Sequence, residues 1–254
     1  MLTAVVCSDD RMLFVYKKLH TYMNVMMIDK ESDLLALPLL DALILPVKGI
    51  DADGYLKMDD TRVHVPSMFW TIQKDVKVFS GIPCEYLQRL VQEKDYYMKD
   101  QHVIEENAVL TAEGVLHLLI TSISKSLYDI QVDVVGYGNC GKAIYQMLKN
   151  LDVNVRVIRR ECSEDAVFQK LSSWDQCADV IVTTSIQKVI DEERMKHWKK
   201  TPLIIDIATP DVVDIAAAKR RGIKVIKAGN LPGRFCAESA GRIIADYVRG
   251  KLNK

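Results

Sequence analysis

The sequence predicts an α/β protein made of two parallel-sheet domains, with a cleft between the domains and a long helix at their junction. Short apolar runs alternate with helical patterns in both halves of the chain, and this alternation is typical of parallel sheets. A helical pattern at residues 105–126 separates the halves. We therefore expect one domain at residues 1–104, completed by a C-terminal helix at 238–250, and a second domain at 105–237.

Each short apolar run is expected to form one strand. The runs lie at residues 2–7, 24–28, 42–45, 62–65, 76–79 and 96–98 in the first domain, and at 132–135, 153–158, 180–183, 203–206 and 224–226 in the second. Helices are expected at 12–22, after a capping residue among 8–10, at 84–94, and at the junction, where residues 111–114 open the helix. Residues 46–60 hold two glycines and four aspartates, which indicate a loop.

Composition excludes several classes of function. Lysine and arginine (34) balance aspartate and glutamate (34), so no excess of positive charge favours a nucleic-acid phosphate backbone. The six cysteines include no CxxC pair and no zinc-like ligand spacing, so reduced thiols in the cytoplasm are expected. No apolar run reaches the roughly 20 residues that a membrane-spanning helix needs.

A glycine-rich turn follows the first strand of the second domain. Gly136, Tyr137, Gly138, Asn139, Cys140 and Gly141 lie between the apolar run and a helical pattern, the order that a Rossmann-like dinucleotide fingerprint requires. Gly136 permits the tight turn, Gly138 allows the backbone to approach a pyrophosphate, and Gly141 allows the helix to pack against the strand. The alternative is a Rossmann-like unit whose crevice is empty or occluded.

The next strand distinguishes between cofactors. NAD-binding folds often place an acidic residue about 20 residues after the glycines to hold the ribose 2′-hydroxyl. Here Arg159 and Arg160 end the strand, and guanidinium groups suit the 2′-phosphate of NADP. We therefore expect NADP rather than NAD, although the arginines could be solvated and Glu161 could serve NAD.

Small polar residues follow the later strands, where the nicotinamide half of a dinucleotide would lie. They are Thr183, Thr184, Ser185 and Asp206. Their alternative role is ordinary capping and turn formation. In the first domain, Ser80 and Gly81 form a turn at the end of a strand, where open α/β sheets bind ligands. Arg234, in a predicted loop at 228–234, is either a carboxylate ligand or a surface charge. No catalytic residue is identified.

Several stretches together resemble one known family, the A subunits of dipicolinate synthase. They are VVCSDDRMLFVYKKL, DALILPV, VFSGIPCEYL, NAVLTAEGVL, VVGYGNCGKAIYQMLKNLDVNVRVIRR, PLIIDIAT and GNLPGRFCAESAGRIIADYV. The resemblance covers residues 5–248 and implies an NADP-dependent oxidoreductase that oxidises dihydrodipicolinate to dipicolinate during sporulation, in the mother cell. It also implies that the partner is a flavoprotein-like B subunit, and we expect a homo-oligomer.

The resemblance also implies which residues form the sites. The three glycines would hold the pyrophosphate and Arg159 or Arg160 the 2′-phosphate. The residues that would line the substrate side of the cleft are Ser80, Gly81, Thr111, Glu113, Leu231, Pro232, Gly233 and Arg234, and Arg11 and Arg234 would hold a dicarboxylate.

Two departures from the family pattern fall on the substrate side. Cys7 and Ser8 replace a glycine pair, and Glu238 occupies a lysine position, which reverses a charge beside the expected dicarboxylate. Two alternatives follow: a related dehydrogenase for another carboxylic acid, or a non-catalytic NADP-binding subunit.

Overall fold

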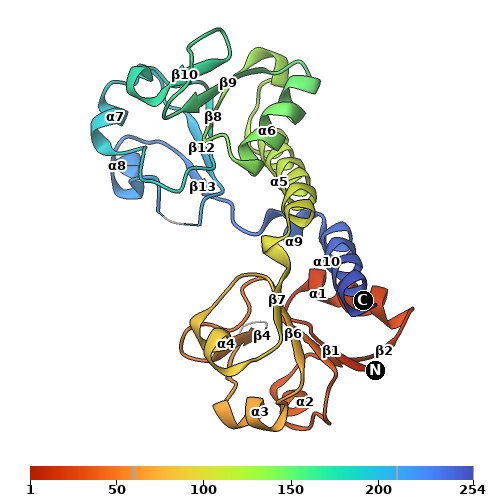
Figure 1. Ribbon diagram of the computed structural model, residues 1–254. Coiled ribbons are helices and arrows are strands. Elements are labelled where there is room, and N and C mark those ends of the chain that lie inside the picture. The colour runs from red at the N-terminus through yellow and green to blue at the C-terminus, as the bar shows by residue number, and fades with distance from the viewer. Residues whose placement is uncertain (59–60, 210, 254) are drawn as a thin grey trace. The chain divides into compact units, whose positions relative to one another are not determined.

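The computed structural model describes residues 1–58, 61–209 and 211–253, so residues 59–60 of the predicted loop lie outside the described residues. Internal contacts divide the chain into two compact units. Unit 1 comprises Met1–Asn107 and Cys236–Lys254, and unit 2 comprises Ala108–Phe235. Each unit contains its own parallel sheet, which confirms the predicted fold class of two Rossmann-like α/β domains (Figure 1).

The sheet of unit 1 has five parallel strands in the order β2-β1-β3-β6-β7. Counted along the chain this is the 2-1-3-4-5 order of flavodoxin-like folds. The strands are β1 (Leu2–Val6), β2 (Asn24–Ile28), β3 (Ala42–Ile44), β6 (Lys77–Ser80) and β7 (Lys94–Tyr96). Such a sheet carries its ligand-binding loops at the carboxyl ends of the strands.

Two helices distant in sequence pack together in unit 1: α1 (Asp10–His20) and the C-terminal helix α10 (Ala237–Leu252). Asp9 caps α1 by accepting a hydrogen bond from the Met12 amide at 3.0 Å. The two helices approach closely where they cross, because Gly241 lacks a side chain. A Cβ at this position would lie 2.6 Å from the carbonyl oxygen of Arg11. The C-terminal helix therefore completes the unit that the N-terminus begins.

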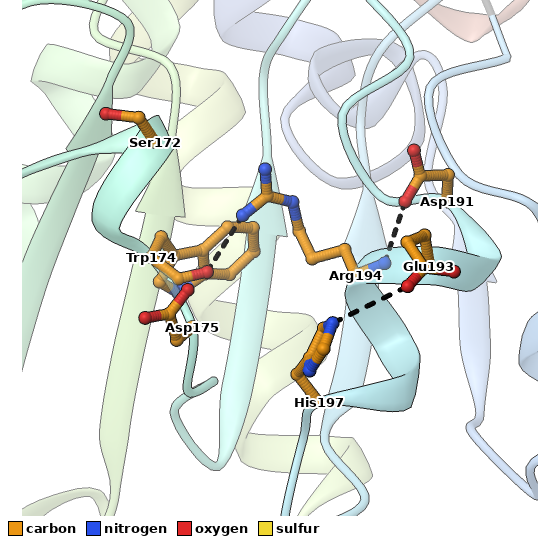
Figure 2. A pocket seen from close by; sticks show the side chains of 7 residues that line it. All are labelled: Ser172, Trp174, Asp175, Asp191, Glu193, Arg194 and His197. Atoms are coloured by element: carbon orange, nitrogen blue, oxygen red, sulfur yellow. Dashed lines mark hydrogen bonds and ion pairs between the residues drawn. The ribbon is translucent and has the colours of Figure 1, made fainter.

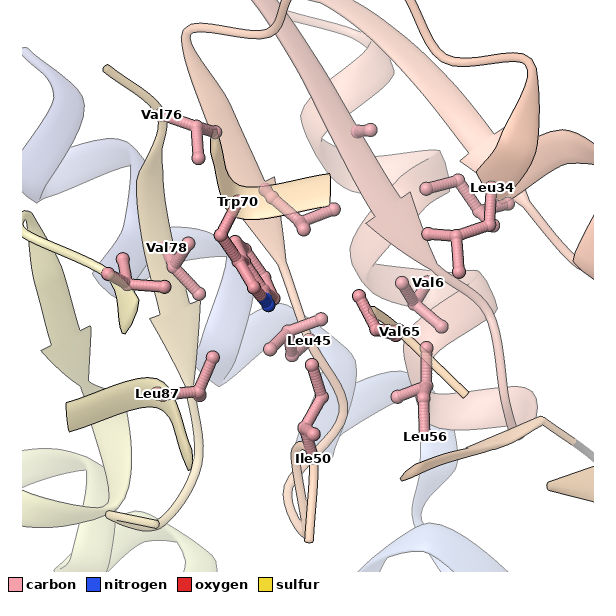
Figure 3. Packing of buried hydrophobic residues seen from close by; sticks show 14 of the residues in the cluster. Val6, Leu34, Leu45, Ile50, Leu56, Val65, Trp70, Val76, Val78 and Leu87 are labelled. Atoms are coloured by element: carbon pink, nitrogen blue, oxygen red, sulfur yellow. The ribbon is translucent and has the colours of Figure 1, made fainter. Parts of the chain in front are cut away.

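The main core of unit 1 lies against one face of its sheet. Side chains from α2 (Glu31–Leu35), α3 (Ser67–Ile72) and α4 (Glu85–Leu90) pack there, with Trp70 in their midst (Figure 3). A hairpin of β4 (Tyr55–Met58) and β5 (Thr61–His64) covers part of this core. The predicted loop at 46–60 thus contains a strand, and the run at 62–65 pairs in the hairpin instead of the main sheet. Among the described residues of the hairpin, only alternate ones such as Leu56 and Val63 are buried, as expected of a ribbon with one solvated face.

The helix at the junction, α5 (Gln101–Ser122), begins earlier than the sequence predicts. Asp100 accepts hydrogen bonds from the amides of His102 at 3.0 Å and Val103 at 3.3 Å, and this cap fixes the start. Residues 111–114 therefore lie inside α5, and the prediction that they open the helix is wrong. Likewise α4 ends at Leu90, and the strand predicted at 96–98 is β7 followed by the short 3₁₀ helix η1 (Tyr97–Lys99).

The sheet of unit 2 has six parallel strands in the order β10-β9-β8-β11-β12-β13. They are β8 (Gln131–Val135), β9 (Asn154–Arg159), β10 (Phe168–Lys170), β11 (Val180–Thr183), β12 (Leu203–Asp206) and β13 (Val225–Lys227). Counted along the chain this is the 3-2-1-4-5-6 order of dinucleotide-binding folds. The sequence did not reveal β10, which is only three residues long and half-buried. Chain order reverses between β8 and β11, and ligands bind at such a switch point.

Helices cover both faces of this sheet (Figure 1). One face packs on α5 and α6 (Asn139–Asn150), and the other on α7 (Glu192–Lys196) and α8 (Ile215–Arg220). Strand residues alternate between the two cores: Val134 and Val182 join the first, whereas Val135 and Ile181 join the second. The remaining short elements are η2 (Leu127–Asp129), η3 (Leu171–Ser173) and α9 (Leu231–Phe235).

One carboxylate is fully buried in β8. Asp133 accepts two hydrogen bonds from Arg156, at 2.8 Å from Nε and 3.0 Å from Nη2. It also accepts from the Trp174 indole N–H and the Ala178 amide, each at 2.9 Å. Four donors on two oxygens satisfy this carboxylate, so Asp133 links β8, β9 and the segment before β11 and has a structural role.

Cys177 lies beside this network, and burial raises the pKa of its thiol to about 11, with a smaller contribution from the Asp133 charge. We expect Cys177 to resist iodoacetamide in the folded protein near pH 9, the ordinary thiol pKa, and to react as the pH approaches 11. The folded state favours the neutral thiol, so this contribution to stability is complete below pH 9 and is lost as the pH rises through 11. Mass spectrometry over a pH series measures the rate at which iodoacetamide alkylates Cys177, with urea-unfolded protein as control. Equal alkylation rates in the folded and unfolded samples near pH 9 would contradict the raised pKa.

Candidate dinucleotide site

The glycine turn after β8 has the geometry that the sequence predicts. Gly136 has a φ of 102°, and a Cβ there would lie 2.5 Å from Oγ1 of Thr184. A Cβ on Gly141 would clash with the carbonyl oxygen of Gly136. Gly138 differs, because apart from its own atoms and its two chain neighbours no described atom lies within 4 Å of the position its Cβ would occupy. The fold itself thus requires two glycines, and the third leaves open space beside the turn.

The N-terminus of α6 faces this turn without a side-chain cap. Gly138 occupies the N-cap position, and the first-turn amides have no partners within the helix. Asn139 is exposed, whereas Cys140 is half-buried and its thiol is hydrogen-bonded to Thr111. Burial raises the pKa of Cys140, and the bond to Thr111 opposes this shift. Cys140 can therefore serve an anion through its backbone amide, and the helix dipole favours negative charge there.

A pocket of about 350 Å³ lies at the switch point of the sheet. It is formed by the ends of β8 and β9 and by the segment after β11, and its lining residues are Val135, Gly136, Tyr137, Gly138, Ile158, Arg159, Arg160, Leu171, Thr184, Ser185, Ile186, Gln187 and Val189. The lining combines an apolar wall with two guanidinium groups and holds no carboxylate. This combination fits an aromatic base joined to a ribose that carries a phosphate group.

The two arginines at the end of β9 are held differently. The Arg159 guanidinium lies over the ring of Tyr137, 5.3 Å from its centroid, and 6.0 Å from the centroid of Phe168. Arg160 donates a hydrogen bond from Nη2 to Oε1 of Gln187 at 2.7 Å. Glu161, the alternative partner for NAD, is 81% exposed, lies 3.9 Å from Lys170 and does not line the pocket.

The small polar residues after the later strands separate into two groups. Thr184 and Ser185 line the pocket, whereas Thr183 is fully buried and accepts a bond from the Ser185 amide. Asp206 is buried, 2.7 Å from Nζ of Lys227, and accepts a hydrogen bond from the Ala208 amide. Asp206 therefore has the partner that a buried carboxylate requires, and Thr183 and Asp206 lie outside the pocket lining.

The segment predicted as a loop with Arg234 forms the short helix α9 instead. Leu231 packs directly on α5, since a Cβ on Gly114 would lie 2.7 Å from Cβ of Leu231, and this contact fixes the segment. Leu231 and Pro232 are buried, Gly233 is half-buried and Arg234 is exposed. On α5, Thr111 is buried and Glu113 exposed. Of these substrate-side candidates, Glu113 and Arg234 present exposed charges.

Three substrate-side candidates belong to unit 1. Arg11 is only 6% exposed, and Nη2 donates to Asp9 at 2.8 Å. Ser80 is fully buried at the end of β6, and Gly81 lies directly against the backbone of Val47. Of the residues that depart from the family pattern, Cys7 is buried at the end of β1, whereas Glu238 is exposed in the first turn of α10.

A second depression of about 230 Å³ in unit 2 lies among Trp174, Arg194 and His197 (Figure 2). Arg194 donates from Nη1 to the carbonyl oxygens of Leu171 and Trp174, and its guanidinium lies 5.3 Å from the Trp174 ring. His197 lies 3.6 Å from Glu193. These charged groups already partner neighbouring groups, so this depression offers no comparable ligand site. The described ranges contain no cluster of side chains suited to a metal ion and no helix able to span a membrane.

The sequence did not identify the apolar wall or the aromatic support of the pocket. The missed residues are Ile158, Phe168, Leu171, Ile186, Gln187 and Val189. Ile158 ends a predicted strand, but the others come from segments whose place beside β8 depends on β10 and on the sheet order. An isolated isoleucine between Ser185 and Gln187 is the one local signal.

Part of the chain is similar to a known class of dehydrogenases. Residues 111–229 match the family model of the D-isomer specific 2-hydroxyacid dehydrogenase, NAD binding domain. A glyoxylate reductase from Pyrococcus horikoshii is 29% identical over 118 residues, 42% of this chain and 34% of the relative. These similarities support a dehydrogenase-type oxidoreductase whose nicotinamide dinucleotide-binding domain lies at residues 111–229.

The more extensive similarity is to the A subunit of dipicolinate synthase. The Bacillus subtilis (strain 168) protein is 24% identical over 228 residues, 82% of this chain and 76% of the relative. The crystal structure of the corresponding Bacillus halodurans protein covers all of this chain and 98% of its own, at 22% identity and a TM-score of 0.85. The resemblance inferred from the sequence motifs is confirmed, and the shared fold extends over both units.

Proposed function

We propose that the protein is an NADP-dependent oxidoreductase of the dipicolinate synthase A type. The observation that carries the proposal is the unit 2 pocket, in which a glycine turn meets two arginines and no carboxylate. A carboxylate is the usual partner of an NAD ribose, whereas arginines suit the 2′-phosphate of NADP. The helix-α6 amides beside Gly138 would hold the pyrophosphate.

The protein would supply binding, orientation and charge. When bound, the nicotinamide supplies the hydride chemistry. The open side of Gly138 admits the pyrophosphate, and Thr184 and Ser185 place hydroxyl groups along the same wall. The apolar side chains of Ile158, Leu171 and Val189 would receive the base and exclude water from it.

Dihydrodipicolinate is the proposed substrate, with Arg11 and Arg234 as candidate ligands of its carboxylates. Buried Arg11 donates to Asp9 from Nη2, while its Nε has no partner among the described residues. Exposed Arg234 lies 5.1 Å from the Phe235 ring centroid. Oxidation of the dihydro ring to the aromatic dicarboxylate would remove a hydride, for which bound NADP⁺ would be the acceptor, and would release one proton. The proposal also includes a flavoprotein-like B subunit as partner, a homo-oligomeric state and a sporulation role in the mother cell.

The test of this reaction is NADPH formation from freshly made dihydrodipicolinate, followed by absorbance of the reduced cofactor. Parallel reactions contain or lack the flavoprotein-like B subunit. We expect cofactor reduction that depends on both the protein and the substrate. Tight NADPH binding without turnover in either reaction would support instead the non-catalytic role.

A second candidate is a dehydrogenase for another carboxylic acid. The exposed carboxylate of Glu238, at a position where the resemblance implies lysine, disfavours a dianion nearby and motivates this alternative. The family match to 2-hydroxyacid dehydrogenases also supports it. A panel of 2-keto monocarboxylates with NADPH separates the two candidates, since turnover of these acids alone would favour the second.

A further inference from the structure

We infer that the two adjacent arginines have different functions: Arg159 selects the 2′-phosphate, and Arg160 positions a wall of the pocket used by NADPH and NADH alike. This inference rests on the proposed NADP site and assigns its specificity. Both residues line the pocket and carry the same charge, so the sequence alone does not distinguish them. Their contacts in the structure do.

Arg159 rests on an aromatic platform formed by Tyr137 and Phe168, whose rings meet edge to face with centroids 5.2 Å apart. Stacking on ring faces orients a guanidinium while leaving its in-plane N–H donors available. Within the described part of the chain, the Arg159 guanidinium has no hydrogen bond or ion pair. It is therefore an oriented donor without an acceptor, beside the pocket for the ribose.

The platform is fixed by the fold. Tyr137 lies between Gly136 and Gly138 in the turn, so its backbone path is set by the glycines. Phe168 is held in register with Val157 by the β10–β9 pairing, and its amide donates to Oδ1 of Asp165 at 2.7 Å. This gives the short strand β10 a function: it supports the arginine that ends β9.

Arg160 has its acceptor already. Its bond to Gln187 joins the end of β9 to the segment after β11, where the backbone N–H of Gln187 also donates to Oγ of Ser185 at 3.1 Å. The braced segment carries Ile186, which is 81% exposed and lines the pocket. An exposed isoleucine at this edge suits the face of the adenine, which NADPH and NADH share.

The experiment compares Arg159→Gln with Arg160→Gln, which make the same substitution and remove the same charge at neighbouring positions. Dissociation constants for NADPH and NADH are measured by calorimetry on the full-length protein. Arg159→Gln should weaken NADPH binding by about 10- to 100-fold, as expected for charge-assisted bonds to a phosphate, and NADH binding by less than about 3-fold. Arg160→Gln should weaken both by a similar factor and preserve their ratio.

Variants of Phe168 test the platform separately. Phe168→Tyr keeps an aromatic ring and should preserve the NADPH to NADH preference, whereas Phe168→Leu should reduce it with little change in NADH affinity. A purely structural role would weaken both cofactors together in Phe168→Leu.

The outcomes separate this inference from the proposed function. Loss of preference in Arg160→Gln, or equal losses of preference in both arginine variants, would overturn the division of roles while leaving an NADP site. A wild-type protein that binds neither dinucleotide would refute the proposed function itself.

Discussion

Replacement of Asp133 by alanine is expected to destabilise unit 2 by about 3 to 5 kcal/mol, the cost of removing one partner of a buried ion pair. The substitution leaves the Trp174 indole and the Ala178 amide without their acceptor and Arg156 without its carboxylate. The desolvation cost of a buried donor without a partner is about 1 to 3 kcal/mol, so the two orphaned donors account for a large part of this loss, which exceeds that of an ordinary surface change.

Denaturant unfolding measures this effect. The protein has three tryptophans, and Trp174 and Trp198 belong to unit 2 whereas Trp70 belongs to unit 1. In a Trp70→Phe background, fluorescence therefore reports unit 2. Asp175→Ala, at an exposed position beside Trp174, is the matched control and should change stability by less than about 0.5 kcal/mol. A loss below about 1 kcal/mol in Asp133→Ala would contradict the assigned role.

Alanine substitutions at two glycines of the turn are expected to affect different properties: Gly138→Ala reduces cofactor binding, and Gly141→Ala reduces the stability of the fold. Gly138→Ala should reduce NADPH affinity by about 10- to 100-fold, because its methyl group enters the open space where the pyrophosphate approaches. Its stability should stay within about 0.5 kcal/mol of the wild type, since no described atom meets the added methyl group.

Gly141→Ala should instead lower stability by about 1 to 3 kcal/mol, because the added Cβ meets the carbonyl oxygen of Gly136, which cannot move as a flexible side chain could. Thermal unfolding and calorimetric titration on the same samples separate the two properties. Equal losses of stability in both variants would show that Gly138 is a packing residue, and the pyrophosphate assignment would then be wrong.

The parts of the fold predicted correctly are those with local signals. Apolar runs define most strands of both sheets, and the glycine turn appears where the sequence places it. Arg159 and Arg160 both line the pocket, because a residue at the end of β9 lies beside the end of β8 in any sheet of this order.

The parts missed depend on contacts distant in sequence. The start of α5 is set by Asp100, which lies directly before the helix in the sequence. The path of α9 is instead fixed by the packing of Leu231 on Gly114, which lies more than a hundred residues earlier in the sequence. Asp206 resembles a cofactor ligand in the sequence, but Lys227 lies 2.7 Å from it in the fold. The difference between Arg159 and Arg160 arises from Phe168 on a strand too short to recognise.

Calorimetric titration of the wild-type protein with NADPH and with NADH tests the central claim most directly, because it needs no substrate and no partner protein. We predict saturable binding of both, with NADPH tighter by about 10-fold or more through its 2′-phosphate. Equal affinities or a preference for NADH would contradict the NADP assignment, and absence of binding by either would contradict the dinucleotide site.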